Sequence, residues 1–386
     1  MDFALTPEQE AIKEAARRFA REKIAPDYQK REREPGLDRR LVKETAALGL
    51  IGVSIPEEFG GLGLDGVTAG LVTEELAYAD FNVGSLIVMG SLIAYILERN
   101  AQPEAAAEWL PKLASGEALA ALGLTEPRGG SDAANLILRA EKSGDEYVLN
   151  GEKTSITLAD QADLVVLFAR TGKPEDGARG VSAFIVPLNQ KGVSRTRFDD
   201  VGCKATGRGS LFFDNVRVPR EYMLGAEGKG FTQVMQGFDF SRVLLGLQCL
   251  APAQASLDEA WQYSTERRAF GAPLAQYQGV TFPLAEADTL LAAARALCYR
   301  TLWLRDRGLP HTAEAAMCKW WPPKLAYEVI HQCLLTHGHY GYTTDLPHQQ
   351  RMRDVLGIQI GDGTAQIMKL IIARERVGKV AVQYAQ

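Results

Sequence analysis

The spacing of apolar residues changes twice along the 386-residue chain. Up to about residue 120, apolar positions recur at helical spacing. From about 121 to 229 they form short continuous runs, and from Gly230 onward the helical spacing returns. We therefore predict a mainly α-helical protein with a middle β domain. The expected organisation is a helical domain at 1–120, a β domain at 121–229 and a helical bundle at 230–386.

The first region opens with a clear helix start. Pro7 follows Thr6 and precedes Glu8 and Gln9, and proline is favoured at the first helical position. A glycine-rich loop, "GLIGVSIPEEFGGLGLDG", should then link a helix ending near Leu48 to one starting near Val67.

The middle region carries strand signals. The runs "DLVVLFAR", "GVSAFIVPL" and "SLFFDNVRVP" are apolar, β-branched or aromatic and are bounded by Gly, Pro or Asp, which is typical of buried strands. Asn150-Gly151 lies between two extended runs, and this dipeptide favours a hairpin turn. We expect a small antiparallel β domain.

Three long helical segments fill the last region, at residues 243–268, 280–308 and 313–338. They are long enough for the helices of a bundle. Pro322-Pro323 interrupts the third segment, so we expect that helix to be kinked or broken into two.

Composition narrows the functional class. The net charge of -5 and the pI near 5.7 argue against a general nucleic-acid binder. The five cysteines include no CxxC pair, so no zinc site or disulfide framework is indicated. The N-terminus lacks the pattern of a signal peptide, and the most apolar stretch, Leu86 to Leu97, is far short of a membrane span. We expect a cytoplasmic protein that contacts no membrane.

Several short motifs could carry chemistry, and each also has a plain structural interpretation. "LTEPRGGSDAANL" could present backbone N–H groups to a polar ligand or form a turn with a capping aspartate. Ser155 and Thr157 alternate along a strand and should share one face, toward a ligand or toward solvent. Arg267 and Arg268 could neutralise a pyrophosphate or complement a helix dipole.

An acid between two glycines, in "GDGT" at residues 361–364, poses the sharpest question. Asp362 precedes an amphipathic run, so it could cap a helix. It could also be a functional carboxylate.

Six segments, in this order, resemble signatures of the acyl-CoA dehydrogenase family: "LTEPRGGSD", "NGEKTSIT", "FDNVRVP", "ERRAFGAPLAQYQ", "HGHYGY" and "GDGTAQI". The resemblance covers essentially the whole chain. It implies a helical N-terminal domain, a barrel-like β domain and a C-terminal four-helix bundle, assembled as a homotetramer (a dimer of dimers). It also implies FAD as cofactor, oxidation of an acyl-CoA thioester to the 2,3-enoyl-CoA, and electron-transfer flavoprotein as the electron acceptor.

The resemblance assigns roles residue by residue. It implies FAD contacts at Leu124, Thr125, Ser155, Thr157, Thr364 and Gln366, with Thr157 near the flavin N5 edge. The pyrophosphate and adenosine would be held across a subunit interface by Arg267, Phe270 and Gln278. Substrate contacts would come from Ser131, Asp239, Arg242 and Gly363. No metal is expected.

The chain departs from the family pattern at the base. The family usually has tyrosine and glutamate where Gly361 and Asp362 stand, and Ser241 occupies the position to which some branches move the base. Asp362 is thus the expected α-proton base, with its backbone N–H polarising the thioester carbonyl. An aspartate base is a feature of the alicyclic acyl-CoA dehydrogenases, and in this respect the chain resembles them. The predicted reaction therefore converts cyclohexane-1-carboxyl-CoA to cyclohex-1-ene-1-carboxyl-CoA.

Other interpretations stay open. The substrate could be cyclohex-1-ene-1-carboxyl-CoA or a branched or short-chain acyl-CoA. A nitroalkane-oxidase-like flavoenzyme or an inactive flavoprotein scaffold would also suit an aspartate at this position. Three further departures are Ser155 where an aromatic residue usually backs the flavin, Leu335 where glutamine often contacts FAD, and His339 where the family has glycine. His337 and His339 could form a metal pair or bond locally.

Overall fold

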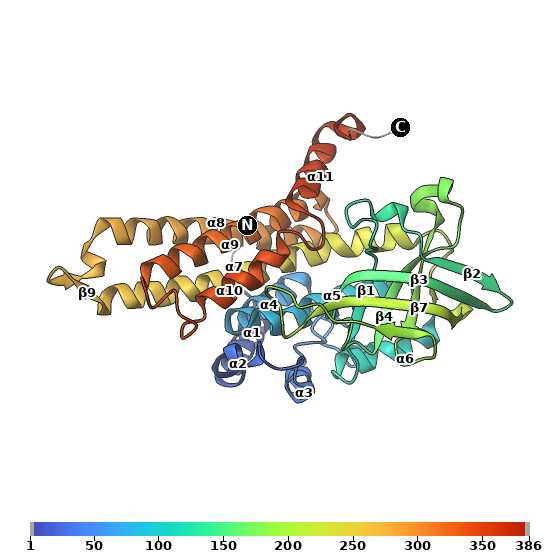
Figure 1. The fold of residues 1–386 in the computed structure, drawn as a ribbon, viewed down its shortest axis with the longest axis horizontal. Helices are drawn as coiled ribbons and strands as arrows, with labels where there is room; N and C mark the ends of the chain where they lie inside the picture. The colour runs from blue at the N-terminus through green and yellow to red at the C-terminus, as the bar shows by residue number, and fades with distance from the viewer. Residues whose placement is uncertain (1–3, 383–386) are drawn as a thin grey trace.

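The computed structural model describes residues 4–382. Figure 1 shows an elongated molecule with a long helical bundle toward one end and a β domain at the other. The predicted fold class is confirmed, because a helical N-terminal part, a middle β part and a C-terminal helical part follow one another along the chain.

The N-terminal part consists of helices joined by short segments, including a π-helical turn at Ala20–Ile24. Its helices are α1 (Pro7–Phe19), α2 (Tyr28–Arg31), α3 (Arg39–Ala47), α4 (Gly66–Ala79), α5 (Phe81–Asn100) and α6 (Pro103–Ala114). As predicted, α1 starts with Pro7 after Thr6. The Thr6 hydroxyl accepts a hydrogen bond from Gln9 N and the Gln9 amide oxygen accepts one from Thr6 N, so the helix start is a reciprocal capping box.

The apolar stretch at 86–97 belongs to a longer element than the sequence indicated. Helix α5 has 20 residues, and by length and composition it could cross a membrane. However, 72% of its most apolar window is buried inside the protein, where α5 packs against α4 and α7. Its hydrophobicity is thus that of a core helix.

The middle part is one eight-stranded sheet in the order β6-β7-β3-β2-β4-β5-β8, with β1 paired to β4. Its strands are β1 (Ala120–Gly123), β2 (Arg139–Ser143), β3 (Glu146–Thr157), β4 (Leu164–Arg170), β5 (Val181–Pro187), β6 (Val193–Arg195), β7 (Arg208–Pro219) and β8 (Met223–Leu224). The three apolar runs form β4, β5 and β7, as predicted. Most pairings are antiparallel, but β1 runs parallel to β4.

The hairpin predicted at Asn150-Gly151 was wrong. Strand β3 continues through both residues, and the turn lies earlier, between Ser143 and Glu146. Gly151 has φ +139° and lies at a register shift between β3 and β7. The glycine therefore serves a bulge, where its conformational freedom is needed just as it would be in a turn.

The C-terminal part is built around α7 (Gly230–Glu266). At 37 residues this helix is about 55 Å long, and it runs between the β domain and the far tip of the bundle (Figure 1). The other elements are β9 (Arg268–Ala269), β10 (Ala272–Pro273), α8 (Gln278–Asp306), α9 (Thr312–Thr336), α10 (His348–Ile358) and α11 (Ala365–Val377).

The proline pair does not break α9, which continues from Thr312 to Thr336 as one helix with both prolines buried. Pro322 cannot donate to the Cys318 carbonyl. That carbonyl faces α7 at Gly246, where a Cβ would stand only 2.7 Å from its oxygen. Pro323 likewise leaves the Lys319 carbonyl without its helical donor. Close packing against α7 holds the helix together where these two backbone hydrogen bonds are missing.

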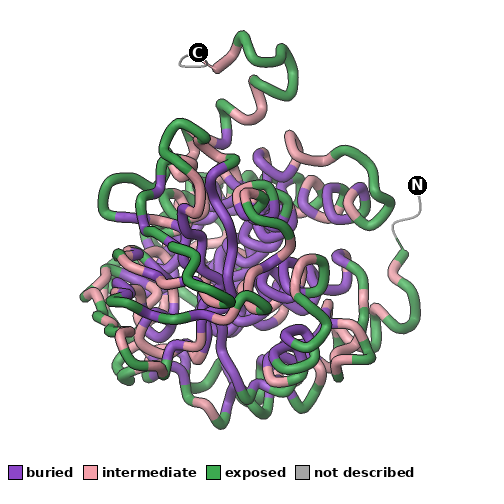
Figure 2. Tube along the Cα trace, turned by 90° about the vertical axis from the view of Figure 1, so that its right-hand side faces the viewer, coloured by how far each residue is buried: buried purple, intermediate pink, exposed green. Residues whose placement is uncertain are grey.

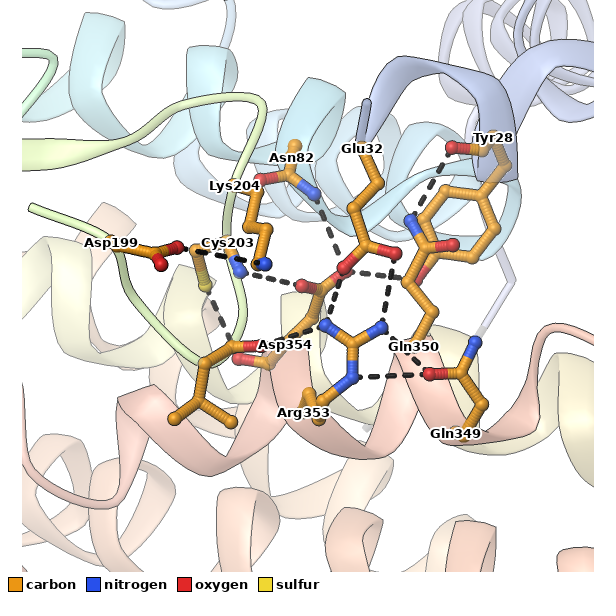
Figure 3. A network of polar contacts seen from close by, with 11 residues as sticks. Tyr28, Glu32, Asn82, Asp199, Cys203, Lys204, Gln349, Gln350, Arg353 and Asp354 are labelled. Atoms are coloured by element: carbon orange, nitrogen blue, oxygen red, sulfur yellow. Dashed lines mark hydrogen bonds and ion pairs between the residues drawn. The ribbon is translucent and has the colours of Figure 1, made fainter. Parts of the chain in front are cut away.

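A buried carboxylate joins the three parts of the chain (Figure 3). Asp354 on α10 accepts hydrogen bonds from Tyr28 Oη at 2.8 Å, Asn82 Nδ2 at 3.3 Å and Cys203 N at 2.6 Å. Burial raises its pKa to about 7. Figure 2 shows that the buried trace runs through the middle of the molecule, while exposed segments form its rim.

Candidate active site

The acid between two glycines lies in the loop that joins α10 to α11. Asp362 has φ +53° and Gly363 has φ +97°, so the chain makes a left-handed turn that glycine adopts most readily and Asp or Asn less readily. The N-cap of α11 is Thr364, whose hydroxyl accepts a hydrogen bond from Ile367 N at 3.3 Å. The capping interpretation of Asp362 is therefore wrong.

The Asp362 side chain is half-buried, and its carboxylate is free of donors within the described residues. Burial raises its pKa, and the positive charges of Lys319 and Arg242 oppose that rise. Within residues 4–382, no group donates a hydrogen bond to the carboxylate, and the backbone N–H of Asp362 has no acceptor. A carboxylate of this kind keeps its lone pairs available for a proton.

Lys319 is a buried charged residue next to the Asp362 loop that the sequence analysis missed. It lies on α9, its side chain is fully buried, and its ammonium donates to Ile358 O at 2.6 Å and to Gly363 O at 3.0 Å. A signal did exist, because Lys319 is a charged residue directly after the apolar run "AAMC". Nothing in the sequence, however, connects it with a loop some 40 positions away.

Helix α7 brings two predicted substrate residues beside Asp362. Arg242 Nη1 lies 3.1 Å from Asp239 Oδ1, and Asp239 Oδ2 accepts a hydrogen bond from Thr312 Oγ1 at 2.6 Å. The Arg242 side chain is 6% exposed, and its Nε is buried without a partner within the described residues. Burial lowers the pKa of Arg242, against the attraction of Asp239 and Asp362. Ser241 is buried and donates only to Phe238 O, at 3.5 Å.

A second loop, after β1, carries Leu124, Thr125 and Ser131. Lys153 on β3 holds this loop in place, because its ammonium donates to Leu124 O at 3.0 Å and to Glu126 Oε1 at 2.7 Å. Leu124 is buried, Thr125 is half-buried and Ser131 is exposed. The Thr125 carbonyl accepts a hydrogen bond from Thr154 N at 2.9 Å, so this loop lies next to the predicted hydroxyl pair on β3.

The hydroxyl pair itself lies at an irregular stretch of β3. The register shifts between Lys153 and Ile156, and Ser155 has φ +59°. Ser155 is exposed and Thr157 is half-buried, with buried Ile156 between them. The bulge interrupts the simple alternation that the sequence predicted for this stretch.

Three predicted cofactor residues lie far from this loop. Arg267, Phe270 and Gln278 surround the small β9–β10 hairpin, which forms the tip of the molecule opposite the β domain (Figure 1). All three are exposed, and Phe270 is 99% exposed at φ +48°. No side chain within residues 4–382 pairs with the Arg267 guanidinium. One chain therefore does not bring these residues to Leu124 and Thr125.

The remaining predicted positions divide between the loop and the surface. Thr364 is engaged as the α11 cap, Gln366 is exposed on α11, and Leu335 is 55% exposed on α9. His337 is buried and its Nδ1 lies 2.8 Å from Cys333 O, whereas His339 is exposed and stacks on Tyr340. Within residues 4–382, no group of three metal-ligating side chains occurs.

Comparison with known proteins identifies the family. Models of the acyl-CoA dehydrogenase N-terminal, middle and C-terminal domains match residues 6–117, 121–216 and 228–376. The short-chain-specific acyl-CoA dehydrogenase of Clostridium acetobutylicum is 34% identical, over 97% of this chain and 99% of that protein.

Two solved structures resemble this chain over nearly the whole length of both proteins. Butyryl-CoA dehydrogenase from Megasphaera elsdenii has a TM-score of 0.94 at 34% identity, covering 98% of this chain and 100% of that one. A chain from a study of the electron transferring flavoprotein of Acidaminococcus fermentans has a TM-score of 0.93 at 34% identity, with the same coverage. The protein belongs to the acyl-CoA dehydrogenase family and is an FAD-dependent oxidoreductase.

The residues present suit a flavin. The loop after β1 and the bulge of β3 place the hydroxyls of Thr125, Ser155 and Thr157 on neighbouring, partly open segments, and a flavin ring needs such donors at its rim. An unpaired guanidinium such as that of Arg267 suits a pyrophosphate. FAD would thus be held by two separate regions, the β domain and the β9–β10 tip of a helical bundle.

Proposed function

We propose that the protein removes the α-proton of an alicyclic acyl-CoA with Asp362 and forms the 2,3 double bond, most simply on cyclohexane-1-carboxyl-CoA. The observation that carries the proposal is the state of Asp362. Within the described residues, it offers a half-buried carboxylate without donors, whose pKa burial raises, and a backbone N–H without an acceptor. These are the two groups that α-deprotonation of a thioester needs.

The two groups act on one carbonyl. The Asp362 N–H would hydrogen-bond the thioester oxygen and stabilise the enolate charge that develops there. The carboxylate would take the α-proton, while the β-hydrogen leaves with its electron pair. When bound, FAD supplies the two-electron acceptor. Arg242 and Asp239 would hold the CoA portion, together with Ser131, and Gly363 would lie against the acyl group.

A wide acyl group is supported by the space beside the base. A Cβ added at Gly361 would meet one atom within 4 Å, the Gly357 oxygen at 3.5 Å. The family's usual tyrosine would fill this space. Aspartate is also one methylene shorter than glutamate, so the α-carbon must approach more closely, which the open backbone permits.

A short, straight acyl chain is the second candidate. It is favoured by the names of the relatives, which include a short-chain-specific enzyme and a butyryl-CoA dehydrogenase. For either substrate we propose electron-transfer flavoprotein as the acceptor, supported by the similarity to a chain from a study of such a flavoprotein. We also propose a homotetramer, because the β9–β10 hairpin beside Arg267, Phe270 and Gln278 lies at the opposite end of the molecule from β1, which directly precedes Leu124 (Figure 1). A site shared by these residues needs more than one chain.

The test is flavin reduction without oxygen. The purified holoenzyme is mixed separately with cyclohexane-1-carboxyl-, cyclohex-1-ene-1-carboxyl-, butyryl- and octanoyl-CoA, and the visible flavin absorbance is followed. We expect rapid bleaching by the cyclohexane thioester and none in Asp362→Asn. Bleaching by butyryl-CoA alone would favour the short-chain candidate. Full activity of Asp362→Asn would show that Asp362 is not the base.

A further inference from the structure

Lys319 holds the two ends of the loop that carries Asp362. Its ammonium donates to the carbonyl of Ile358, the last residue of α10, at 2.6 Å. It also donates to the carbonyl of Gly363, the residue directly after Asp362, at 3.0 Å. A single buried group on α9 thereby fixes where the loop leaves α10 and where it passes Asp362.

The ammonium is charged in a place that disfavours charge. Its side chain is fully buried, and burial lowers the pKa of Lys319 to about 8. The charged or titratable groups that face it are Asp362 on the loop and Cys249 and Arg242 on α7. Burying a lysine is costly, so a position that merely completes a core would be better filled by an apolar side chain.

The Asp362 turn needs outside support. A non-glycine residue at positive φ is strained, Asp362 is flanked by glycines, and its own side chain accepts no hydrogen bond within the described residues. The carbonyl bonds from Lys319 are the side-chain bonds that the loop receives at positions 358–363. The positive charge also favours the ionised form of the carboxylate that must accept the proton.

We propose that Lys319 is the positioning residue of the catalytic base: its ammonium ties down the loop on both sides of Asp362 and keeps the carboxylate ionised and aimed at the α-carbon. This inference rests on the proposed role of Asp362. The alternative is a purely structural lysine that satisfies the last carbonyls of α10. The two differ in what happens to proton transfer when the protein remains folded.

The test uses the holoenzyme with Lys319→Met, which keeps the length of the side chain but removes charge and donors. The matched control is Lys324→Met, five positions along the same helix, where the lysine is 53% exposed and pairs with Glu328. Flavin content and melting temperature are measured first. We then expect a roughly 100-fold slower flavin reduction in Lys319→Met, an acidic limb of the pH–rate profile shifted upward, and no change in Lys324→Met.

A second variant separates the tether from the charge. Lys319→Gln can still donate to one carbonyl, so part of the rate should return while the acidic limb stays shifted. Combining Lys319→Met with Asp362→Asn should slow the residual reaction no further, because Lys319 acts through Asp362. Folded Lys319→Met with unchanged rate and pH profile overturns the positioning role, even when Asp362→Asn is inactive and the proposed function stands.

If neither variant retains flavin, the pH dependence of flavin reduction in the unmodified enzyme tests the inference. The neutral amine left after Lys319 loses its proton keeps two N–H groups, but it binds the two carbonyls more weakly and removes the positive charge beside Asp362, so the flavin reduction rate should fall above about pH 8. A rate that stays constant to pH 10 would contradict the inference. If Asp362→Asn is fully active, the proposed function itself is wrong, which is a different outcome from either of these.

Discussion

The Nζ atom of Lys153 lies 2.7 Å from Oε1 of Glu126, with both side chains almost completely buried. Glu126 also accepts hydrogen bonds from the backbone N–H groups of Ile137 and Leu138. The pair thereby joins β3 to both ends of the loop that bears Leu124, Thr125 and Ser131. Burial lowers the pKa of Lys153 to about 8, against the attraction of Glu126.

Breaking this pair should loosen the loop after β1 that bears Leu124, Thr125 and Ser131. Lys153→Met leaves the Glu126 charge buried without its ammonium, which costs about 3–5 kcal/mol of unfolding free energy. We expect a lower melting temperature and loss of FAD on gel filtration. Adding Glu126→Gln should recover part of the stability, because no unpaired charge remains. Lys112→Met, at an exposed helix pair, is the control, and a Lys153→Met protein that keeps both stability and flavin would contradict this view.

The two glycines beside Asp362 should differ in tolerance. At Gly363, φ is +97° and an added Cβ would lie 2.5 Å from Met368 Cε, so Gly363→Ala should cost roughly 1–3 kcal/mol of unfolding free energy. Gly361→Ala meets one oxygen at 3.5 Å and should fold normally. Denaturant unfolding of the two variants measures the difference, and equal stabilities would show that the loop is less constrained than its geometry indicates.

Stability below pH 6.5 should depend on His348. Its side chain is fully buried, neither ring nitrogen has a hydrogen-bond partner within residues 4–382, and Nε2 lies 3.8 Å from Glu259 Oε2. Burial lowers the pKa of His348 to about 4, against the attraction of Glu259. The unfolded chain binds the proton more readily, so unfolding free energy should fall as pH drops from 6.5 toward 4, by about 3 kcal/mol from this group.

The comparison with His348→Phe isolates that effect. The variant should lack the acid-dependent loss in denaturant titrations at pH 7 and pH 4.5. Asp354 acts in the opposite direction, because its raised pKa favours the folded state as pH falls from 7 toward 4. The wild type alone would therefore show only the difference of the two contributions. Parallel pH dependences in wild type and variant would rule out His348 as the cause.

Two inactive variants should complement each other if the cofactor site lies between chains. Arg267→Glu removes the unpaired guanidinium at the bundle tip, and Asp362→Asn removes the base. In mixed oligomers, some sites would combine Asp362 of one chain with Arg267 of another and regain flavin reduction. Each variant alone stays inactive as the control. Absence of any activity in co-expressed mixtures would mean that every site is built from one chain.

The sequence predicted those parts of the fold that depend on burial and failed where one residue type serves two purposes. The runs that became β4 and β5 are apolar because both faces of those strands are covered. Strand β7 is continuously buried only from Gly209 to Leu211, and Asp214, Asn215 and Arg217 in its second half are exposed. Asn150-Gly151 looked like a turn, yet the same backbone freedom serves a bulge. Pro322-Pro323 lies in an intact helix because α7 packs against the carbonyl that Pro322 leaves free.

The sequence suggested candidate site residues but not the groups that hold their loops in place. Asp362, Asp239 and Arg242 lie in recognisable motifs, and the structure does bring them near one another. Lys319 and Lys153 were missed because a lone lysine ordinarily indicates a solvated surface. Their partners are carbonyl groups, which have no sequence signature, so only the folded backbone reveals them.

The bonds to Asp354 have a consequence for how the protein comes apart. One carboxylate on α10 receives donors from the N-terminal helices and from the β domain, and α10 leads directly into the Asp362 loop. Pulling the N-terminal helices or the β domain away from α10 would take hydrogen-bond donors from this buried carboxylate. The three parts should therefore melt in a single calorimetric transition, and limited proteolysis should cut the chain without releasing a stable fragment.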